Sequence, residues 1–445
     1  MQLPKGENVM EKNECKKRAI EAIDDNRGKI YGLFESVAAE PELGFKEFKT
    51  SEKIKSYFQS LNYDYEEGVG ITGVISTRKG RSSKLKVAVM GELDAVISPT
   101  HPQADKATGA VHACGHNAQL SALAGVATAL HDADLMKELD GDVALMAVPA
   151  EEYIELEYRN QLRKEGKIGF LGGKQEFIRL GKFDDVDMML MQHTAMTEEN
   201  FKAGAGSDCN GFLGKLIRYE GKPAHAGGAP FDGINALNAA AIGLLAVHAQ
   251  RETFRDEDHI RVHPIITKGG DVVNVVPADV RLEAYVRGAN TPAILDANAK
   301  VSRALKAGGD AVGAKTEITD MPGYLPSILC DPLMDLAVEN MRQLTDPGYV
   351  QKICAGFGGG STDAGDVSQL MPVLHAFFGG ATGGFHSGKF QIIDRDNAIL
   401  MAAKCLTMVL IDLLWDGAKE GLKIKESYKP ALTKAEYLEK WGGIQ

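Results

Sequence analysis

The segment HACGHN contains Cys114 and His116 two residues apart, directly before a stretch with helical periodicity. A thiolate and an imidazole presented together suit a transition metal such as zinc. The pair alone is weak evidence for a metal site, because a buried thiol beside an unrelated histidine is the commoner arrangement in an intracellular chain. The hypothesis of a metal site therefore depends on further ligands elsewhere in the sequence.

Two adjacent carboxylates, Glu151 and Glu152, follow the apolar segment GDVALMAVPA. Such pairs usually lie in a solvated turn. A strand as apolar as VALMAV is expected to be buried, however, and residues at the end of a buried strand in an α/β sheet commonly line the ligand crevice. His193 ends a second apolar segment, VDMMLMQH, and His386 lies among glycines in GGFHSGKF. Strand ends and tight loops thus present four metal ligands and a spare glutamate.

Seven sequence motifs are spread over nearly the whole chain: EPELGFKEFKTSEKI at 40–54, GELDAV at 91–96, HACGHN at 112–117, PAEE at 149–152, GKPAHAGGAPFDGINAL at 221–237, GGDVVNVVPADV at 269–280 and GSTDAGDVS at 360–368. With these motifs in this order, the chain resembles the aminoacylase and carboxypeptidase type of dinuclear metallopeptidases. The similarity is greatest to the amidohydrolase branch, which includes the p-aminobenzoyl-glutamate hydrolases and the indole-acetyl-amino-acid hydrolases.

The resemblance implies five ligands for two divalent metal ions: Cys114, His116, Glu152, His193 and His386. It also implies that Glu151 is the general base. Physical chemistry agrees, because two cations need about five protein ligands and an open position, and a bridging thiolate, here Cys114, can screen their repulsion. A carboxylate close to an activated water can take its proton as the water attacks an amide. Zn, Mn and Co all tolerate this ligand mixture.

Further residues match positions that support the reaction in the family. Asp94 could fix the tautomer of a ligand histidine or merely cap a helix or turn. His225 matches a histidine that reaches across a dimer as an oxyanion donor; the alternative is a loop histidine near a turn. Asn274 and Arg287 match residues that hold the substrate's free carboxylate. Without the resemblance, Arg287 would be interpreted as a surface charge at a strand end. Gly360, which begins GSTDAGDVS, is assigned to the same subsite.

Seven further histidines carry no such pattern. His112, four residues before His116, either supports the ligands or packs in the core. The others are expected on the surface or as satisfied core residues: His101, His131, His248, His259, His263 and His375.

Length and composition predict a large soluble protein. The chain has 445 residues, of which 44% are hydrophobic, so it should form at least two domains. Six scattered cysteines without a CxxC pair predict a reducing compartment. The absence of an 18-residue apolar run or signal-peptide core predicts a cytoplasmic protein without a membrane partner. A net charge of −11 without a basic stripe makes nucleic acid an improbable partner.

The order of elements predicts an α/β fold: a mixed-sheet catalytic domain with helices on both faces, similar to zinc exopeptidases. Its first part would contain helices at 10–36, 49–60 and 119–131 and strands at 85–91, 142–148 and 186–192. From about 208, the pattern changes to strand 214–221, helix 233–250, strands 260–267 and 279–286, helix 293–307 and strand 314–319. This segment predicts an inserted α+β sandwich, by resemblance a lid and dimerisation domain, which ends near a linker at 321–327. The predicted boundaries are 1–207 and 323–445 for the catalytic domain and 208–322 for the insertion.

One departure from the family lies at 153–173, an extra charged and aromatic stretch after Glu152 that could reshape the acyl pocket. The sequence predicts a metal-dependent amidohydrolase that cleaves N-acyl amino acids, aminobenzoyl-glutamate-like conjugates or small dipeptides with a free carboxylate, as a homodimer. The alternatives are a non-catalytic or weakly active partner subunit of a heteromeric amidohydrolase, and a metal-buffering or metal-sensing protein. Neither alternative needs the general base Glu151.

Overall fold

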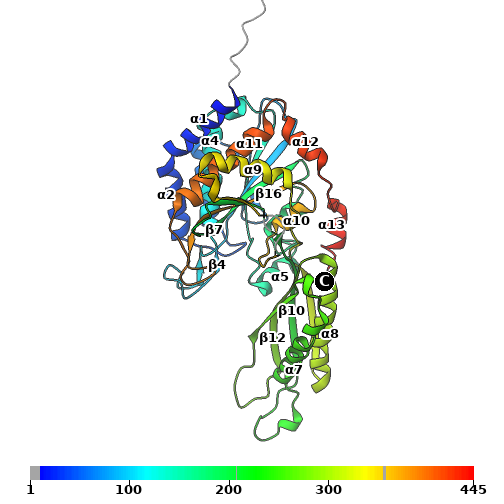
Figure 1. Ribbon diagram of the computed structural model, residues 1–445. Coiled ribbons are helices and arrows are strands. Elements are labelled where there is room, and N and C mark those ends of the chain that lie inside the picture. The colour runs from blue at the N-terminus through cyan, green and yellow to red at the C-terminus, as the bar shows by residue number, and fades with distance from the viewer. Residues whose placement is uncertain (1–10, 207, 354–356, 445) are drawn as a thin grey trace, which may run out of the picture.

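The computed structural model describes residues 11–206, 208–353 and 357–444, which form two lobes (Figure 1). Cys354 and the polar first ten residues lie outside the described residues. The upper lobe in Figure 1 contains a nine-stranded sheet covered by helices, and the elongated lower lobe contains a four-stranded sheet.

Four parallel strands, β6, β3, β7 and β16, form the centre of the large sheet. In spatial order the strands are β1 (Glu66–Val69), β2 (Gly73–Arg78), β6 (Asp142–Val148), β3 (Lys86–Glu92), β7 (Met188–Met196), β16 (Val373–Thr382), β8 (Ala203–Ala205) and β14 (Val350–Lys352), with β17 (Gln391–Ile392) paired to β16. Every residue of β6 is buried, as expected for a strand covered on both faces. The carboxyl ends of the parallel strands meet at one edge, where α/β sheets bind ligands.

Helices cover both faces of this sheet, which confirms the predicted mixed α/β fold. One face carries α1 (Lys12–Asp25), α2 (Arg27–Ala39), α3 (Phe48–Ser60), α4 (His116–Asp132), α9 (Asp331–Leu344), α11 (Ala402–Leu414) and α12 (Lys419–Ser427). The other face carries α6 (Gly173–Arg179), α10 (Ala364–Ser368) and α13 (Lys434–Lys440). The helical stretch Asp396–Leu414 is apolar enough to cross a membrane, with a mean hydropathy of 1.8, but 94% of it is buried, as in a core helix.

The lower lobe is an antiparallel sheet with two helices on one face. Its strands, in spatial order, are β11 (Arg261–Lys268), β12 (Asp279–Gly288), β10 (Gly211–Glu220) and β13 (Lys315–Pro322). Alternate residues of β12 are buried against α7 (Ala236–Ala249) and α8 (Thr291–Val312), so the opposite face of the sheet is left to contact the upper lobe. Two small strand pairs complete the fold: β4 (Val96–Ile97) with β5 (Ala110–Val111), and β9 (Asp208–Cys209) with β15 (Phe357–Gly358).

The predicted single helix at 10–36 is wrong, because α1 ends at Asp25 and α2 begins at Arg27. The side-chain amide of Asn26 donates to the carbonyl oxygen of Ala22 at 2.9 Å. Local side-chain bonds of this kind compete with continuation of a helix.

One predicted strand end in the sheet region is also wrong. His193 does not end its strand, since β7 continues to Met196 along β16. The stretch 321–327, predicted as a linker, contains the end of β13 at Pro322 and then residues that belong to no helix or strand. It is buried, because Tyr324 and Leu325 are only 2% and 3% exposed, and Tyr324 packs in an aromatic cluster that joins the two lobes.

Gly125→Ala is expected to destabilise the upper lobe, because a Cβ at Gly125 of α4 would lie 2.7 Å from the Cβ of Ala403 on α11. Overpacking costs about 1–3 kcal/mol, which outweighs the roughly 1 kcal/mol that alanine gains over glycine in a helix. Gly32→Ala on α2 is the matched control, since no described atom lies within 4 Å of its added Cβ. Denaturant unfolding should give opposite signs for the two variants; a stabilising Gly125→Ala would contradict this close helix contact.

Candidate metal centre and active site

Cys114 lies at the centre of two groups of metal-ligand atoms. Its Sγ forms one group with His116 and His193 and another with Glu152 and His386, and the atoms of each group lie within 4.8 Å of one another. Gly115, between Cys114 and His116, has a φ of +92°, which an L side chain rarely adopts. This turn into α4 lets the thiol and the first imidazole of the helix face one point.

The two ring nitrogens of His116 have different surroundings. Nδ1 donates to the carbonyl oxygen of Asp94 at 2.9 Å and lies 3.3 Å from Oδ1 of the same residue. Nε2 is therefore left as the lone-pair nitrogen, 3.0 Å from Oε2 of Glu92. Asp94 also accepts the backbone N–H of Glu152 at 2.8 Å, so one carboxylate orients residues of both groups.

His193 and His386 each have a ring nitrogen within 4.8 Å of the thiol of Cys114. Nδ1 of His193 donates to the carbonyl oxygen of Thr194 at 2.8 Å, which leaves Nε2 free at 3.4 Å from the Sγ of Cys114. Nε2 of His386, in the loop after β16, lies 3.1 Å from Oε1 of Glu152. All these side chains come from the carboxyl edge of the parallel strands or from the start of α4.

The donor set fits divalent cations on an independent observation. Nε2 of His116, Oε1 of Glu152 and Oε2 of Glu92 are buried, and none makes a hydrogen bond of regular geometry among the described residues, although Nε2 of His116 lies 3.0 Å from Oε2 of Glu92 and Oε1 of Glu152 lies 3.1 Å from Nε2 of His386. Unpaired buried polar atoms are costly and rare in native proteins. Their convergence on one small volume with a thiol is what a metal site requires.

Glu151 and Glu152 are adjacent but electrostatically unlike. Burial, with nearby Glu92 and Glu152, raises the pKa of Glu151 well above its usual range. Burial also opposes the ionisation of Glu152, but the hydrogen bond and charge of His386 lower the pKa of Glu152 to about 2. Carboxyl groups that are pushed apart in this way can serve as a proton carrier and a permanent anion.

The loop that carries these glutamates is held at several points. Ala150 has a φ of +54°, unusual for a residue with a Cβ. Its N–H donates to the buried carboxylate of Glu47 at 2.8 Å, and its carbonyl oxygen accepts from Nη1 of Arg159 at 3.3 Å. The hydroxyl of Tyr324 donates to the carbonyl oxygen of Glu151. These contacts fix the direction of both glutamate side chains.

The extra stretch after Glu152 joins the two lobes. It contains α5 (Leu156–Lys164), and Arg159 from this helix also donates to the carbonyl oxygen of Leu171 at 2.8 Å, which closes the base of the stretch. Tyr153 packs edge-on against Phe212 and Tyr285 of the lower sheet, and its hydroxyl donates to the carbonyl oxygen of Pro322 at 2.9 Å.

Arg287 lies at the end of β12 nearest the upper lobe. Nη1 donates to the hydroxyl of Ser361 at 3.1 Å, and Nε is buried without a partner in the part of the chain that the structure describes. Burial lowers the pKa of Arg287. Gly360, beside Ser361, is exposed, and its carbonyl oxygen accepts the N–H of Asn210 at 2.9 Å. A partly desolvated guanidinium with a spare donor suits a carboxylate.

His225 and Asn274 are not brought to this site within one chain. Both are exposed and lie together, since the N–H of Ala226 donates to the carbonyl oxygen of Asn274 at 3.0 Å. They lie beyond the far ends of β10 and β12, strands of ten residues each. Roughly 30 Å of strand therefore separates them from Arg287. Nδ1 of His225 accepts from the N–H groups of Gly227 and Gly228, so Nε2 carries the hydrogen of the neutral ring.

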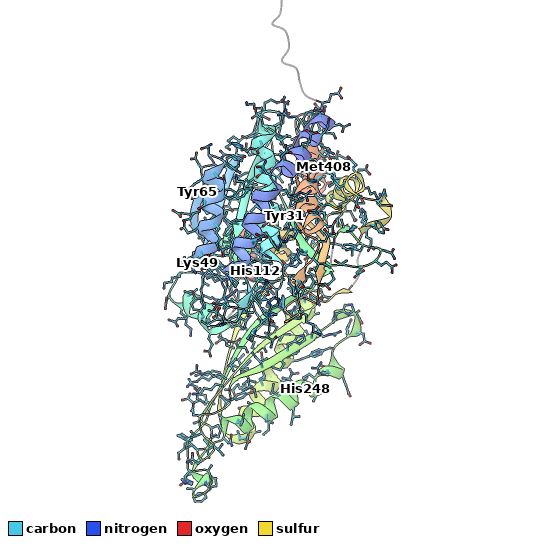
Figure 2. All side chains as sticks on the ribbon, turned by 90° about the vertical axis from the view of Figure 1, so that its left-hand side faces the viewer. Tyr31, Lys49, Tyr65, His112, His248 and Met408 are labelled. Atoms are coloured by element: carbon cyan, nitrogen blue, oxygen red, sulfur yellow. The ribbon has the colours of Figure 1, made fainter. Side chains whose placement is uncertain are left out.

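Two of the remaining histidines, His112 and His375, lie in the interior of the upper lobe. Figure 2 shows His248 on the lower lobe and His112 in the upper lobe. His112 is buried, which lowers its pKa to about 3, and it lines a cavity of about 640 Å³ with Asn117. His375, expected on the surface or as a satisfied core residue, packs with its ring centroid 6.3 Å from that of His193, and its Nε2 has no partner within the described ranges.

Sequence reasoning missed Glu92, Lys174 and Asp363. Lys174 lies 2.5 Å from carboxylate oxygens of both acidic residues. Glu92 could have been predicted from the alternation of side chains along a strand, which places Glu92 and Asp94 of GELDAV on the same side. The pairing of Lys174 with Asp363 had no local signal, since 189 positions separate them.

Fold and site together define a hydrolase with a metal-type donor set at the carboxyl edge of an α/β sheet and an inserted second lobe. The chain belongs to peptidase family M20/M25/M40, whose family model matches residues 88–412. The resemblance found in its motifs is thereby confirmed, and the protein is an amide-bond hydrolase of this metal-dependent family.

Similar proteins cover most of the chain. The Xaa-Arg dipeptidase of Mus musculus is 25% identical over 94% of this chain and 95% of its own length. A p-aminobenzoyl-glutamate hydrolase homolog of Haemophilus influenzae is 27% identical over 56% of this chain and 66% of its own. A dinuclear metal binding peptidase from Bacillus subtilis has the same fold, with a TM-score of 0.63 and 21% identity over 88% of this chain and 99% of that one.

Arg159→Met is expected to destabilise the protein and slow its turnover, because two buried carbonyl groups lose a charged donor, at a cost of about 2–3 kcal/mol. Arg163→Met, one turn further along α5, is the matched control, since Arg163 is less buried and, among the described residues, its side chain donates one hydrogen bond, to the carbonyl oxygen of Ile444 at 3.3 Å. Thermal unfolding and the hydrolysis rate should change together for Arg159→Met only. Equal losses in both variants would mean that α5 does not hold the glutamate loop.

Proposed function

We propose that the protein is a dinuclear metal-dependent amidohydrolase that cleaves an N-acyl amino acid, an aminobenzoyl-glutamate-like conjugate or a small dipeptide. The observation that carries the proposal is the sharing of Cys114 between two ligand groups, beside the carboxylate of Glu151, which belongs to a third group with Glu92 and His116. Similarity to the Xaa-Arg dipeptidase of Mus musculus over nearly the whole chain supports peptide-like substrates. A non-catalytic partner protein gains no support, because it would need no general base.

Cys114, His116 and His193 would hold one cation, and Cys114, Glu152 and His386 the other. Zn, Mn or Co suits this mixture of thiolate, imidazole and carboxylate. When bound, the metal pair supplies Lewis acidity that activates a water and polarises the amide carbonyl. A reducing compartment would keep Cys114 from being oxidised, so that it can bind metal as a thiolate, and we therefore place the protein in the cytoplasm.

Glu151 would act as the general base. It belongs to neither group that contains Cys114, and its Oε2 lies 3.8 Å from Nε2 of His116, so it faces the reaction space beside the metal ligands. Its carboxylate would accept the proton of the attacking water and later deliver it to the leaving amine. Asp94 would keep His116 and Glu152 oriented during these steps.

The free carboxylate of the substrate would bind to Arg287 and to the backbone near Gly360. The catalytic unit would be a homodimer, in which His225 and Asn274 of one subunit reach the site of the other. Two observations support the dimer. These residues lie far from their own metal ligands, and apolar side chains are exposed on α7 and the edge strand β11, including Leu245 and Ile265 at 69% and 60%.

Purified protein with measured metal content should hydrolyse members of a panel of N-acyl amino acids, aminobenzoyl-glutamate and dipeptides. Each substrate is paired with its C-terminal carboxamide, which should raise KM because Arg287 loses its anion. Glu151→Gln should keep the metal and lose about 10²–10⁴ of the rate. Glu152→Gln should instead lower the metal content per chain. A fully active Glu151→Gln, or equal metal loss in both variants, would contradict the division of roles.

His225→Ala should fold and bind metal normally but turn over about 10²–10³ times more slowly, as expected on loss of an oxyanion donor. Mixing it with Glu151→Gln should restore activity, because a hybrid dimer contains one site with both Glu151 and the His225 of its mate. With free exchange, about a quarter of all sites would be complete. Light scattering and subunit exchange of labelled chains provide the controls. No rescue despite proven exchange would mean that His225 does not act across the dimer.

A further inference from the structure

Lys174 is a buried ammonium that none of the proposed steps uses. It follows Gly173 at the start of α6, and its side chain is completely buried. Nζ lies 2.5 Å from Oε1 of Glu92 and 2.5 Å from Oδ1 of Asp363. Burial alone lowers the pKa of Lys174, but Asp363 and Glu92 raise it above its usual range. A charge in this position costs several kcal/mol unless it is well paired, and here two carboxylates pair it.

Glu92 connects this ammonium with the metal ligands. One carboxylate oxygen, Oε1, accepts from Lys174, and the other, Oε2, lies 3.0 Å from Nε2 of His116. The backbone N–H of Glu92 donates to the side chain of Gln119 at 2.8 Å, which fixes the end of β3. With one oxygen tied to Lys174, the second oxygen can only face the imidazole.

Asp363 connects the same ammonium with the predicted carboxylate subsite. Its Oδ2 accepts the backbone N–H of Lys174 at 2.8 Å, so both carboxylate oxygens accept hydrogen bonds from Lys174. Asp363 ends the loop that carries Ser361, and the hydroxyl of Ser361 accepts from Arg287 at 3.1 Å. Lys174 thus lies between two walls of the site. One wall consists of the residues around His116 that would bind metal, and the other is the loop of Ser361 with Arg287, which would bind the substrate's carboxylate.

We propose that Lys174 is a positioning residue that turns Glu92 toward His116 and ties it to the loop of Asp363. The two walls then keep a fixed separation, which sets where the scissile amide lies when the substrate's carboxylate is held. This inference rests on the proposed function, because it takes His116 as a ligand and Arg287 as the carboxylate fork. The competing role is a buried ion cluster that only stabilises the fold.

The test compares Lys174→Met with Lys215→Met in the cobalt-loaded protein. Lys215 is a matched control, since it is also fully buried and is paired with Asp320 and Ser302 in the lower lobe. Two quantities are measured: the visible absorption bands of Co²⁺, which report the ligand field, and kcat and KM per metal-loaded chain. Lys174→Met should shift the bands and lower kcat about 10²-fold, as a misplacement of about 1 Å does. Lys215→Met should lower only the thermal stability.

Glu92→Gln keeps the test decisive if Lys174→Met fails to fold, because Lys174 remains paired with Asp363 in that variant. It should shift the Co²⁺ bands and lower kcat as well. Unchanged bands and kcat in a folded Lys174→Met or Glu92→Gln would overturn the positioning role. The spectrum needs no turnover, so shifted bands in a protein that hydrolyses no substrate of the panel would overturn the proposed function alone.

Discussion

Concentrated negative charge at one edge of the sheet is the constraint on which the site depends. Glu92, Glu151 and Glu152 are buried there near Cys114 and His116, and Asp363 is buried behind them against Lys174. Buried carboxylates of like charge repel one another in a low dielectric and are stable only when cations or hydrogen bonds compensate them. Lys174 compensates one side of the group, and the unpartnered atoms on the other side suit divalent metal.

The rest of the upper lobe keeps these groups in place against that repulsion. Parallel strands deliver Glu92, Glu152 and His193 to one edge, and the glycine turn before α4 adds Cys114 and His116. Ala150 stays in an unfavourable backbone conformation because its amide and carbonyl groups are both bound by buried charged side chains. The site therefore obtains its geometry from rigid elements, which is the condition for preorganised electrostatic catalysis.

The lower lobe carries candidate substrate-binding residues at both of its ends, far from one another. Arg287 lies at the junction of the lobes, next to the aromatic cluster of Tyr153, Phe212 and Tyr285. The opposite ends of the same strands carry His225 and Asn274. Since a ten-residue strand cannot be bent back on itself, the chemistry proposed for these two residues would require a second copy of the chain.

The sequence by itself determined the family and the α/β class and named the candidate ligand residues, because motifs and apolar periodicity are local. Cys114 and His116 could be paired from spacing alone, and Glu151 and Glu152 from a strand end. Only the tertiary structure decided that two ligand groups share Cys114, that β7 extends beyond His193, and that Lys174 joins Glu92 to Asp363. The contacts of Cys114 with His193 and of Lys174 with Glu92 and Asp363 span 79, 82 and 189 positions. They depend on how strands and helices pack, and local sequence patterns do not encode distances of that kind.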